Sequence, residues 1–162
     1  MFALSVEVWA GGDGLSAYLV CGEGVSAAEQ LAAPGKVALL AAAGEHVLAA
    51  CRPGVFVYQY SVSSKQVTAR LDCSKLAPCS ESLQSIAIDE RLAEDRCMIT
   101  AMCTLRGEVY VGTAWGCIVV ADAASLRPLT VFRPYEEECG SSGGAHAGVH
   151  CLLWRAQHWL PD

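Results

Sequence analysis

One hairpin pattern occurs three times in the chain and predicts an all-β fold. The copies are VEVWAGGDGLSAYLV, HVLAACRPGVFVYQY and EVYVGTAWGCIVVAD. In each copy a turn containing glycine joins two apolar segments, as in a β-hairpin. Val8 and Val47 are 39 residues apart, whereas Val47 and Val109 are 62 apart. The longer interval exceeds a propeller repeat of about 40–45 residues by roughly the length of an insertion at 72–96. The sequence therefore predicts an incomplete β-propeller of about two and a half four-stranded antiparallel blades, with a flexible C-terminal tail.

The first of these units, residues 1–35, is predicted to be a partial blade. Alternating apolar residues over 6–10 and 17–21 predict two strands, and the glycine-rich segment 11–14 predicts the turn between them. Three interpretations stay open for 23–35: an outer strand, a helical turn or a loop. Its alanine content favours the helix.

The next unit, residues 36–71, is predicted to be a complete blade. Each predicted strand is short and is followed by a turn or a polar loop. The fourth strand is the most polar, as expected for an outer edge. The four strands are predicted over 36–42, 46–51, 55–60 and 66–71.

An irregular insertion is predicted over residues 72–96. A loop of this length is uncommon inside a compact domain, so it is either packed irregular structure or a functional excursion. Leu83, Ile86 and Ile88 are the candidates for anchoring it, and its acidic end is expected to be solvated.

The second complete blade is predicted over residues 97–133, with strands at 98–104, 108–113, 117–122 and 127–132. Residues 134–162 are predicted to be a linker and tail, because GSSGGAHAG has the composition of a flexible linker. The later phrase VHCLLW also fits the first strand of another blade.

The number of blades limits what residues 1–133 can form alone. Closed propellers have at least about four blades, so this chain is either a fragment or is completed by another chain. The favoured partners are therefore the remaining blades of a parent chain. A plain antiparallel meander or a β-sandwich would share the hairpins and remains the alternative fold.

Composition excludes several classes of function. The 162-residue chain is 53% hydrophobic with a net charge of −6, and phosphate binding needs a basic surface, so no nucleic-acid partner is expected. No apolar run is long enough for a transmembrane helix, and the N-terminal residues lack the basic region of a signal peptide. The nine cysteines include no Cys-x-x-Cys, so reduced thiols and a cytoplasmic location are expected.

The best copy of the repeat carries a resemblance to known proteins. Residues 99–102, ITAM, precede VYVGT at 109–113 and the turn glycine Gly116. This arrangement resembles the late blades in C-terminal WD40-like propellers of large signalling proteins. These are JNK-interacting scaffold proteins, propeller-containing Rho guanine-nucleotide exchange factors and leucine-rich repeat kinases. The similarity covers roughly 44–133, although Gly-His and Trp-Asp pairs typical of WD40 repeats are missing.

The resemblance implies a non-catalytic protein–protein interaction platform in a larger intracellular regulator of small GTPases or kinase signalling. It transfers no catalytic residue, since the enzymatic parts of those proteins lie in other domains. Two alternatives stay open: a truncated fragment without independent function, and a small cysteine-dependent enzyme.

Candidate site residues lie in the predicted turns. Trp115, Arg52 and Arg106 are the candidates for a partner-binding rim, because aromatic and arginine side chains dominate protein interfaces. No catalytic, cofactor-binding or metal-binding residue is assigned, and no cofactor is expected.

Two weaker interpretations concern chemistry. Cys139, His146, His150 and Cys151 have some of the spacing of a zinc site, but the last two are adjacent and point to opposite sides of a strand. A catalytic grouping of His46 with Cys51 or Cys73 and with Asp72 lacks a nucleophile motif, so His46 is expected to be an ordinary strand residue.

Overall fold

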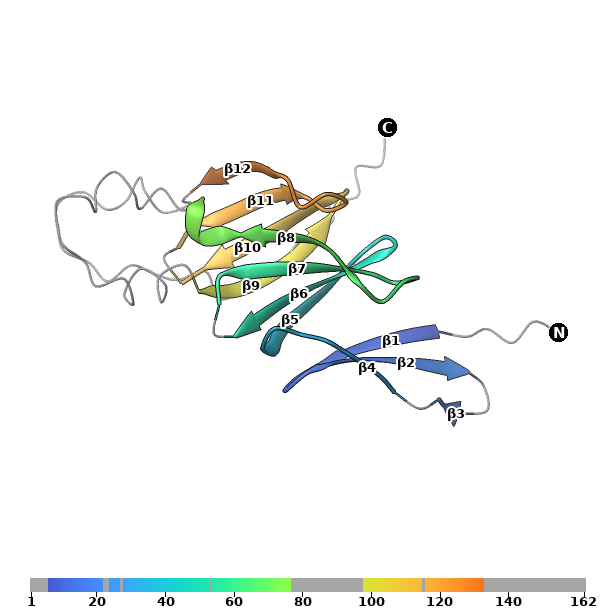
Figure 1. Cartoon of the computed structure of the whole chain (residues 1–162). Coiled ribbons are helices and arrows are strands. Elements are labelled where there is room, and N and C mark those ends of the chain that lie inside the picture. The colour runs from blue at the N-terminus through green and yellow to red at the C-terminus, as the bar shows by residue number, and fades with distance from the viewer. Residues whose placement is uncertain are drawn as a thin grey trace, which may run out of the picture.

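Three antiparallel β-sheets stand side by side in the computed structural model of the chain (Figure 1). The structure describes residues 6–21, 24–26, 28–52, 54–76, 98–114 and 116–132. The sheets follow one another along the chain, and the strands within each sheet pair antiparallel. The predicted all-β fold, an incomplete propeller, is confirmed.

The first sheet contains β1 (Val6–Gly11), β2 (Leu15–Cys21), β3 (Gly24–Val25) and β4 (Glu29–Leu31). Both β3 and β4 pair with β2, at its two ends, so together they fill a single position in the sheet. The helix that alanine content favoured for 23–35 is therefore wrong where the structure describes these residues. Pairing with β2 and burial of apolar side chains outweigh intrinsic helix propensity here.

The second and third sheets are complete four-stranded meanders. The second holds β5 (Lys36–Ala43), β6 (His46–Arg52), β7 (Phe56–Ser61) and β8 (Val67–Asp72). A single 3-10 turn, η1 (Cys73–Lys75), follows it. The third holds β9 (Ile99–Leu105), β10 (Glu108–Thr113), β11 (Ile118–Asp122) and β12 (Pro128–Phe132). All eight strands predicted in these two regions are present, with ends shifted by at most one residue.

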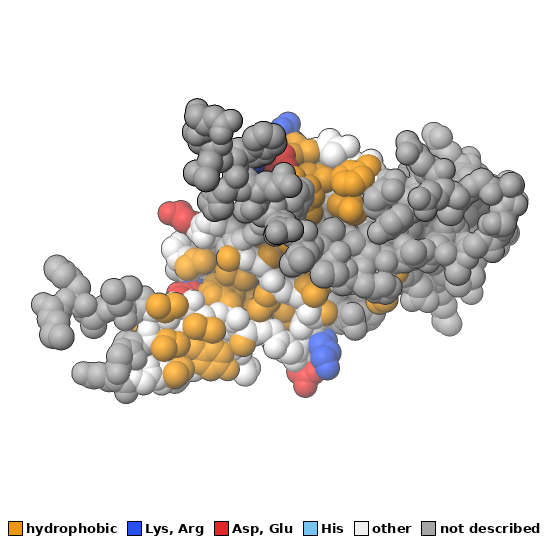
Figure 2. Space-filling model, turned by 180° about the vertical axis from the view of Figure 1, so that it is seen from behind, with side chains coloured by type: hydrophobic (Ala, Val, Ile, Leu, Met, Phe, Trp, Pro, Cys, Tyr) orange, Lys and Arg blue, Asp and Glu red, His pale blue; other side chains and the backbone are white. Residues whose placement is uncertain are grey.

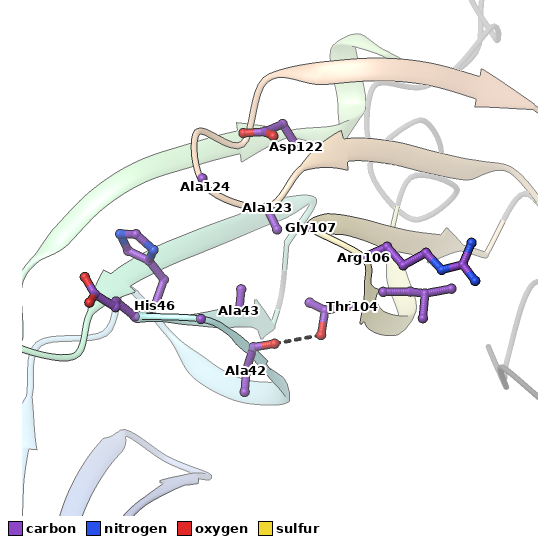
Figure 3. Close-up of a pocket in the computed structure, with 12 residues that line it drawn as sticks. Ala42, Ala43, His46, Thr104, Arg106, Gly107, Asp122, Ala123 and Ala124 are labelled. Carbon is purple, nitrogen blue, oxygen red and sulfur yellow. Dashed lines mark hydrogen bonds between the residues drawn. The ribbon is translucent and has the colours of Figure 1, made fainter. Parts of the chain in front are cut away.

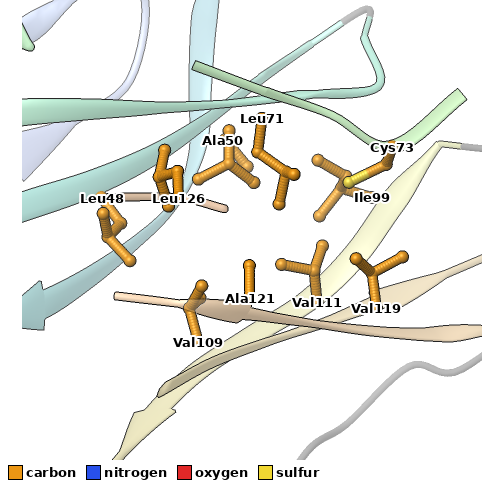
Figure 4. Close-up of a cluster of buried hydrophobic side chains, with 11 residues drawn as sticks. Leu48, Ala50, Leu71, Cys73, Ile99, Val109, Val111, Val119, Ala121 and Leu126 are labelled. Carbon is orange, nitrogen blue, oxygen red and sulfur yellow. The ribbon is translucent and has the colours of Figure 1, made fainter. Parts of the chain in front are cut away.

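A large apolar cluster joins the second sheet to the third (Figure 4). Val57, Val109, Val111 and Val119 in it are fully buried. Both faces of an inner strand are buried, which explains why β6 and β10 are apolar almost throughout. The buried members are Leu48, Ala50, Val57, Leu71, Cys73, Ile99, Val109, Val111, Val119, Ala121 and Leu126.

A buried glutamine adds polar contacts between the second and third sheets. The side chain of Gln59 is 1% exposed, and its Nε2 donates to the carbonyl oxygens of Ala123 and Ala124, at 2.8 and 2.9 Å. Its Oε1 accepts a hydrogen bond of 2.7 Å from Thr68 Oγ1. Both ends of the amide are thus satisfied, as a buried polar group requires.

The contact between the first and second sheets (the first junction) differs in composition from that between the second and third sheets (the second junction). Its buried cluster is smaller: Leu15, Val37, Ala49, Cys51 and Tyr60. The Trp9 and Tyr60 rings lie 6.1 Å apart, and Lys65 Nζ lies 5.0 Å from the Trp9 ring centre. Lys65 also pairs with Glu7 of β1. At the first junction, aromatic and charged side chains therefore make contacts between sheets that aliphatic side chains make at the second junction.

Several predicted features fall outside the described residues. These are most of the insertion predicted over 72–96, with Leu83, Ile86 and Ile88, and the whole predicted linker and tail at 134–162. The four residues of the zinc interpretation lie in that tail.

Candidate interaction cleft

A cleft of about 500 Å³ lies where turns of the second and third sheets meet (Figure 3). Three turns form it: the β5–β6 turn, the β9–β10 turn and the β11–β12 turn. Tight turns place backbone and small side chains on the wall, so the cleft is shaped by the fold itself. Its lining residues are Ala42, Ala43, Gly44, Glu45, His46, Thr104, Leu105, Arg106, Gly107, Asp122, Ala123 and Ala124.

Hydrogen bonds hold these turns together. Thr104 Oγ1 donates to the carbonyl oxygen of Ala42, 2.6 Å away across the junction, as Figure 3 shows. Within the third sheet, the Ala123 N–H donates to the carbonyl oxygen of Gly107 at 2.8 Å. Gln59 holds the β11–β12 turn from the second sheet through the carbonyls of Ala123 and Ala124. A cleft wall anchored at these points is preorganised for binding.

Arg106 lines the cleft from the β9–β10 turn, and its side chain extends away from Ala43 and His46 in Figure 3. It occupies the first position of the two-residue β9–β10 turn, with φ 51°, and Gly107 follows with φ 81°. Positive φ at both positions defines the type I′ turn that suits the twist of a hairpin. Arg106 is exposed, so its guanidinium is available to a carboxylate or an aromatic ring of a partner.

Asp122 is already engaged in the β11–β12 turn. Its Oδ1 accepts hydrogen bonds from the Ser125 N–H at 2.8 Å and from Ser125 Oγ at 2.6 Å. These bonds favour the charged form and lower the pKa of the Asp122 carboxyl. The aspartate therefore acts as a turn cap with a fixed negative charge.

The side chains of the proposed catalytic grouping are not brought together. His46 and Cys51 lie five positions apart on β6, a separation of about 17 Å along an extended strand. Asp72 pairs with Phe56, at the opposite end of the second sheet from His46. Burial raises the pKa of the Cys51 thiol, which opposes a nucleophilic role.

No metal centre is evident in the part of the chain that the structure describes. Among those residues, no three His, Cys, Asp or Glu side chains gather closely enough to hold an ion.

The three candidate rim residues divide between two ends of the sheets. Arg106 precedes β10, whereas position 115 follows it, and a six-residue strand separates these ends by about 20 Å. The backbone of Arg52 ends β6, at the end of the second sheet opposite the β5–β6 turn of the cleft. Trp115 itself and the Arg52 side chain are outside what the structure describes.

Sequence reasoning missed Thr104 and Asp122 as members of the cleft. They come from different hairpins, and only the stacking of sheets brings them near Ala42. The Asp-x-x-Ser spacing of Asp122 and Ser125 is a local sign of a capped turn.

Sequence comparisons give one partial relative. The chain is 34% identical over 89 residues to leucine-rich repeat serine/threonine-protein kinase 1 of Caenorhabditis elegans. The match covers 52% of this chain and 4% of the kinase, so the chain spans a small part of that relative. No known family profile matches the chain.

Solved structures show the same fold at low sequence identity. The N-terminal part of BBS1 in complex with ARL6 aligns with a TM-score of 0.55, 16% identity, and coverage of 93% of this chain and 36% of that one. The RRP9 WD40 repeats align with a TM-score of 0.52, 11% identity, and coverage of 80% and 36%. A chain of the mitotic checkpoint complex aligns with a TM-score of 0.52, 11% identity, and coverage of 93% and 41%.

These likenesses show a propeller fold. In the described residues, no helix has the length and apolar character needed to cross a membrane. The alignments cover about two-fifths or less of the solved structures named above.

Proposed function

We propose that the chain is a non-catalytic protein-interaction platform, part of the WD40-like propeller of a larger cytoplasmic signalling regulator. The observation that carries the proposal is the cleft: three turns from two sheets, held by hydrogen bonds, present Arg106 beside a wall of small side chains. A preformed cleft of mixed polarity with an exposed arginine in one of its turns suits recognition of a protein surface.

The proposed role in signalling is supported by a similarity that covers only part of the chain. The repeat resembles propellers of kinases and exchange factors, and the 34% identity to a leucine-rich repeat kinase covers about half of this chain. In addition, one solved propeller with this fold is in complex with ARL6, and another belongs to the mitotic checkpoint complex. We therefore propose partners in small-GTPase or kinase signalling, with the activity of the whole protein residing elsewhere.

Site-specific photo-crosslinking in cells tests this proposal. A benzophenone amino acid at Ala124, on the cleft, is expected to capture a defined signalling protein, which mass spectrometry identifies. The same amino acid at Leu129, a 45% exposed position outside the cleft, is the matched control. Arg106→Glu is expected to abolish the crosslink at position 124. Equal capture from both positions, or capture unaffected by Arg106→Glu, would reject the cleft as the binding site.

The variant Trp115→Ala distinguishes a partner site at the cleft from one near Trp115. Because Arg106 precedes β10 whereas Trp115 follows it in the sequence, the cleft crosslink is expected to persist in this variant. Loss of the crosslink without loss of folding would move the partner site to the other end.

A further inference from the structure

The direction of β1 identifies which strands of a blade the first sheet contains. The Val37 N–H, at the start of β5, donates to the carbonyl oxygen of Gly12 in the β1–β2 turn, at 2.7 Å. At its other end β1 meets Lys65 of the β7–β8 turn through Glu7. The strand therefore runs antiparallel to β5 and in the same direction as β6.

The close approach at Gly11 supports this placement. A Cβ atom at Gly11 would lie 2.6 Å from Val37 Cγ1, so the end of β1 is pressed against the start of β5. The β1–β2 turn thus belongs to the same end of the stack as the β6–β7 and β10–β11 connections. By this correspondence, β1 matches β6 and β10, β2 matches β7 and β11, and β3 with β4 matches β8 and β12.

Among the described strands, the first sheet then has no counterpart of β5 and β9. In the complete sheets, β5 pairs with β6 and β9 pairs with β10, so each second strand has a neighbour on both edges. Among the described residues, β1 pairs with β2 alone. Its second edge carries backbone N–H and C=O groups without a strand partner, the arrangement that accepts an added strand.

Side chains of β1 are more exposed than those of its counterpart β6, as expected for a strand with one unpaired edge. Five consecutive residues of β6, Val47 to Cys51, are each at most 7% exposed. Val6 and Val8 of β1 are 54% and 44% exposed. Hydrophobic side chains gather over the first sheet in the view from behind (Figure 2). The apolar sequence of β1 is that of a covered strand, although the described residues leave it uncovered.

We propose that the free edge of β1 accepts an extended strand from a polypeptide outside residues 1–162, in the position that β5 and β9 hold in their sheets. The chemistry of the occupant follows from those two strands, KVALLAAA and ITAMCTL: seven or eight residues, small and aliphatic, uncharged along the centre. It pairs antiparallel with β1.

In the complete sheets, the strand that holds this position is joined to its neighbour by a short turn. The β5–β6 and β9–β10 connections each use a two-residue turn after a strand of eight or seven residues. The inference rests on the fold and is independent of the proposed signalling role.

A donor strand fused to the full chain tests the inference. KVALLAAAGE, the sequence of β5 with its turn, replaces residues 1–5 directly before Val6. We expect backbone amide hydrogen exchange in β1 to slow by about tenfold or more, and the urea midpoint of the fused chain to rise. The matched control donor, KVPLPAAAGE, carries two prolines that cannot pair as a central strand, and should change neither quantity.

Two outcomes would overturn the inference. The first is equal protection of β1 by both donors, or β1 amides that already exchange as slowly as those of β10 in the unmodified chain. The second is faster exchange in β1 when the chain is cut after Phe132, because the chain's own C-terminal segment, VHCLLW included, would then be the occupant. The amides of β10, which is flanked by two strands, show in every variant whether the rest of the chain is folded. Because hydrogen exchange is measured on the chain alone, the result does not depend on the proposed signalling partner.

Discussion

The two sheet junctions use different interactions for the same architectural task. Between the second and third sheets, eleven buried residues form an aliphatic cluster, and Gln59 adds hydrogen bonds to a turn. Between the first and second sheets, five buried residues are supplemented by the Trp9–Tyr60 contact and the Lys65–Glu7 pair. The second junction has an innermost strand on both sides, whereas the first has one on a single side. A junction with one described inner strand therefore has the smaller buried cluster, and long aromatic and charged side chains supplement its contacts.

The largest expected effect on stability comes from creating a cavity in the aliphatic cluster between the second and third sheets. Leu48 is fully buried in its cluster, so Leu48→Ala should lower the free energy of unfolding by about 2–5 kcal/mol through lost burial and a cavity. Urea denaturation followed by tryptophan fluorescence measures the change. Leu129→Ala, at a 45% exposed position of β12, is the size-matched control and should change it little. Equal effects of the two substitutions would contradict the assigned core.

The buried amide should have the next largest effect. Gln59→Leu removes both bonds to the β11–β12 turn and leaves two carbonyl groups and Thr68 Oγ1 without this partner, at a cost of about 1–3 kcal/mol. Thr68→Val removes the bond into the amide, together with the 3.4 Å contact of Thr68 Oγ1 with the Gln59 carbonyl oxygen, but leaves both bonds to the turn and should cost less. If Gln59→Leu is neutral or stabilising in the same denaturation experiment, the polar contacts do not hold the junction.

The first junction should respond weakly to single substitutions. Lys65→Met keeps the aliphatic stem over Trp9 but loses the charge, which should cost about 0.5–1 kcal/mol. A double-mutant cycle with Glu7→Gln isolates the pair, and its coupling energy should fall as salt is raised. Salt-independent coupling would show that packing, rather than charge, joins these sheets.

The smallest expected effect concerns the Asp122 turn at the cleft. Because its hydrogen bonds with Ser125 lower the pKa in the folded state, the charged carboxylate stabilises the fold above the unfolded pKa of about 4. This contribution is lost as the pH falls through the lowered folded pKa. Asp122→Asn should therefore flatten the pH dependence of the urea midpoint in the acidic range, compared with the unmodified chain. An unchanged acid profile would mean that the carboxylate makes no net contribution.

Most of the fold of residues 36–71 and 97–133 could be predicted because local signals agree there. Apolar alternation, β-branched residues and turn glycines such as Gly107 and Gly116 all indicate hairpins, so strand ends came out within a residue. Residues 23–35 carried conflicting signals. Alanines favour a helix, yet Leu31 contributes to the first junction and β4 pairs with β2, which the local sequence does not show.

The candidate cleft was less predictable than the strands. Arg106 was found because turns with arginine are visible in a sequence. Thr104 and Asp122 join it only through the register of two sheets and the contact of Thr104 with Ala42, separated by 62 residues. The repeat alignment already pairs the first hairpin with the hairpins β6–β7 and β10–β11, and the bond between Val37 and Gly12 adds the direction of β1 relative to β5.

The distribution of buried thiols gives each junction its own kinetic reporter. Cys51 is 6% exposed in the first cluster, and Cys73 is fully buried in the second. A thiol reagent can reach such a side chain only when the surrounding structure opens. With the other cysteines changed to serine, the labelling rate of each thiol would measure how often its junction separates in otherwise native molecules. The chain would thereby record, without added probes, whether its sheets come apart in succession or all together.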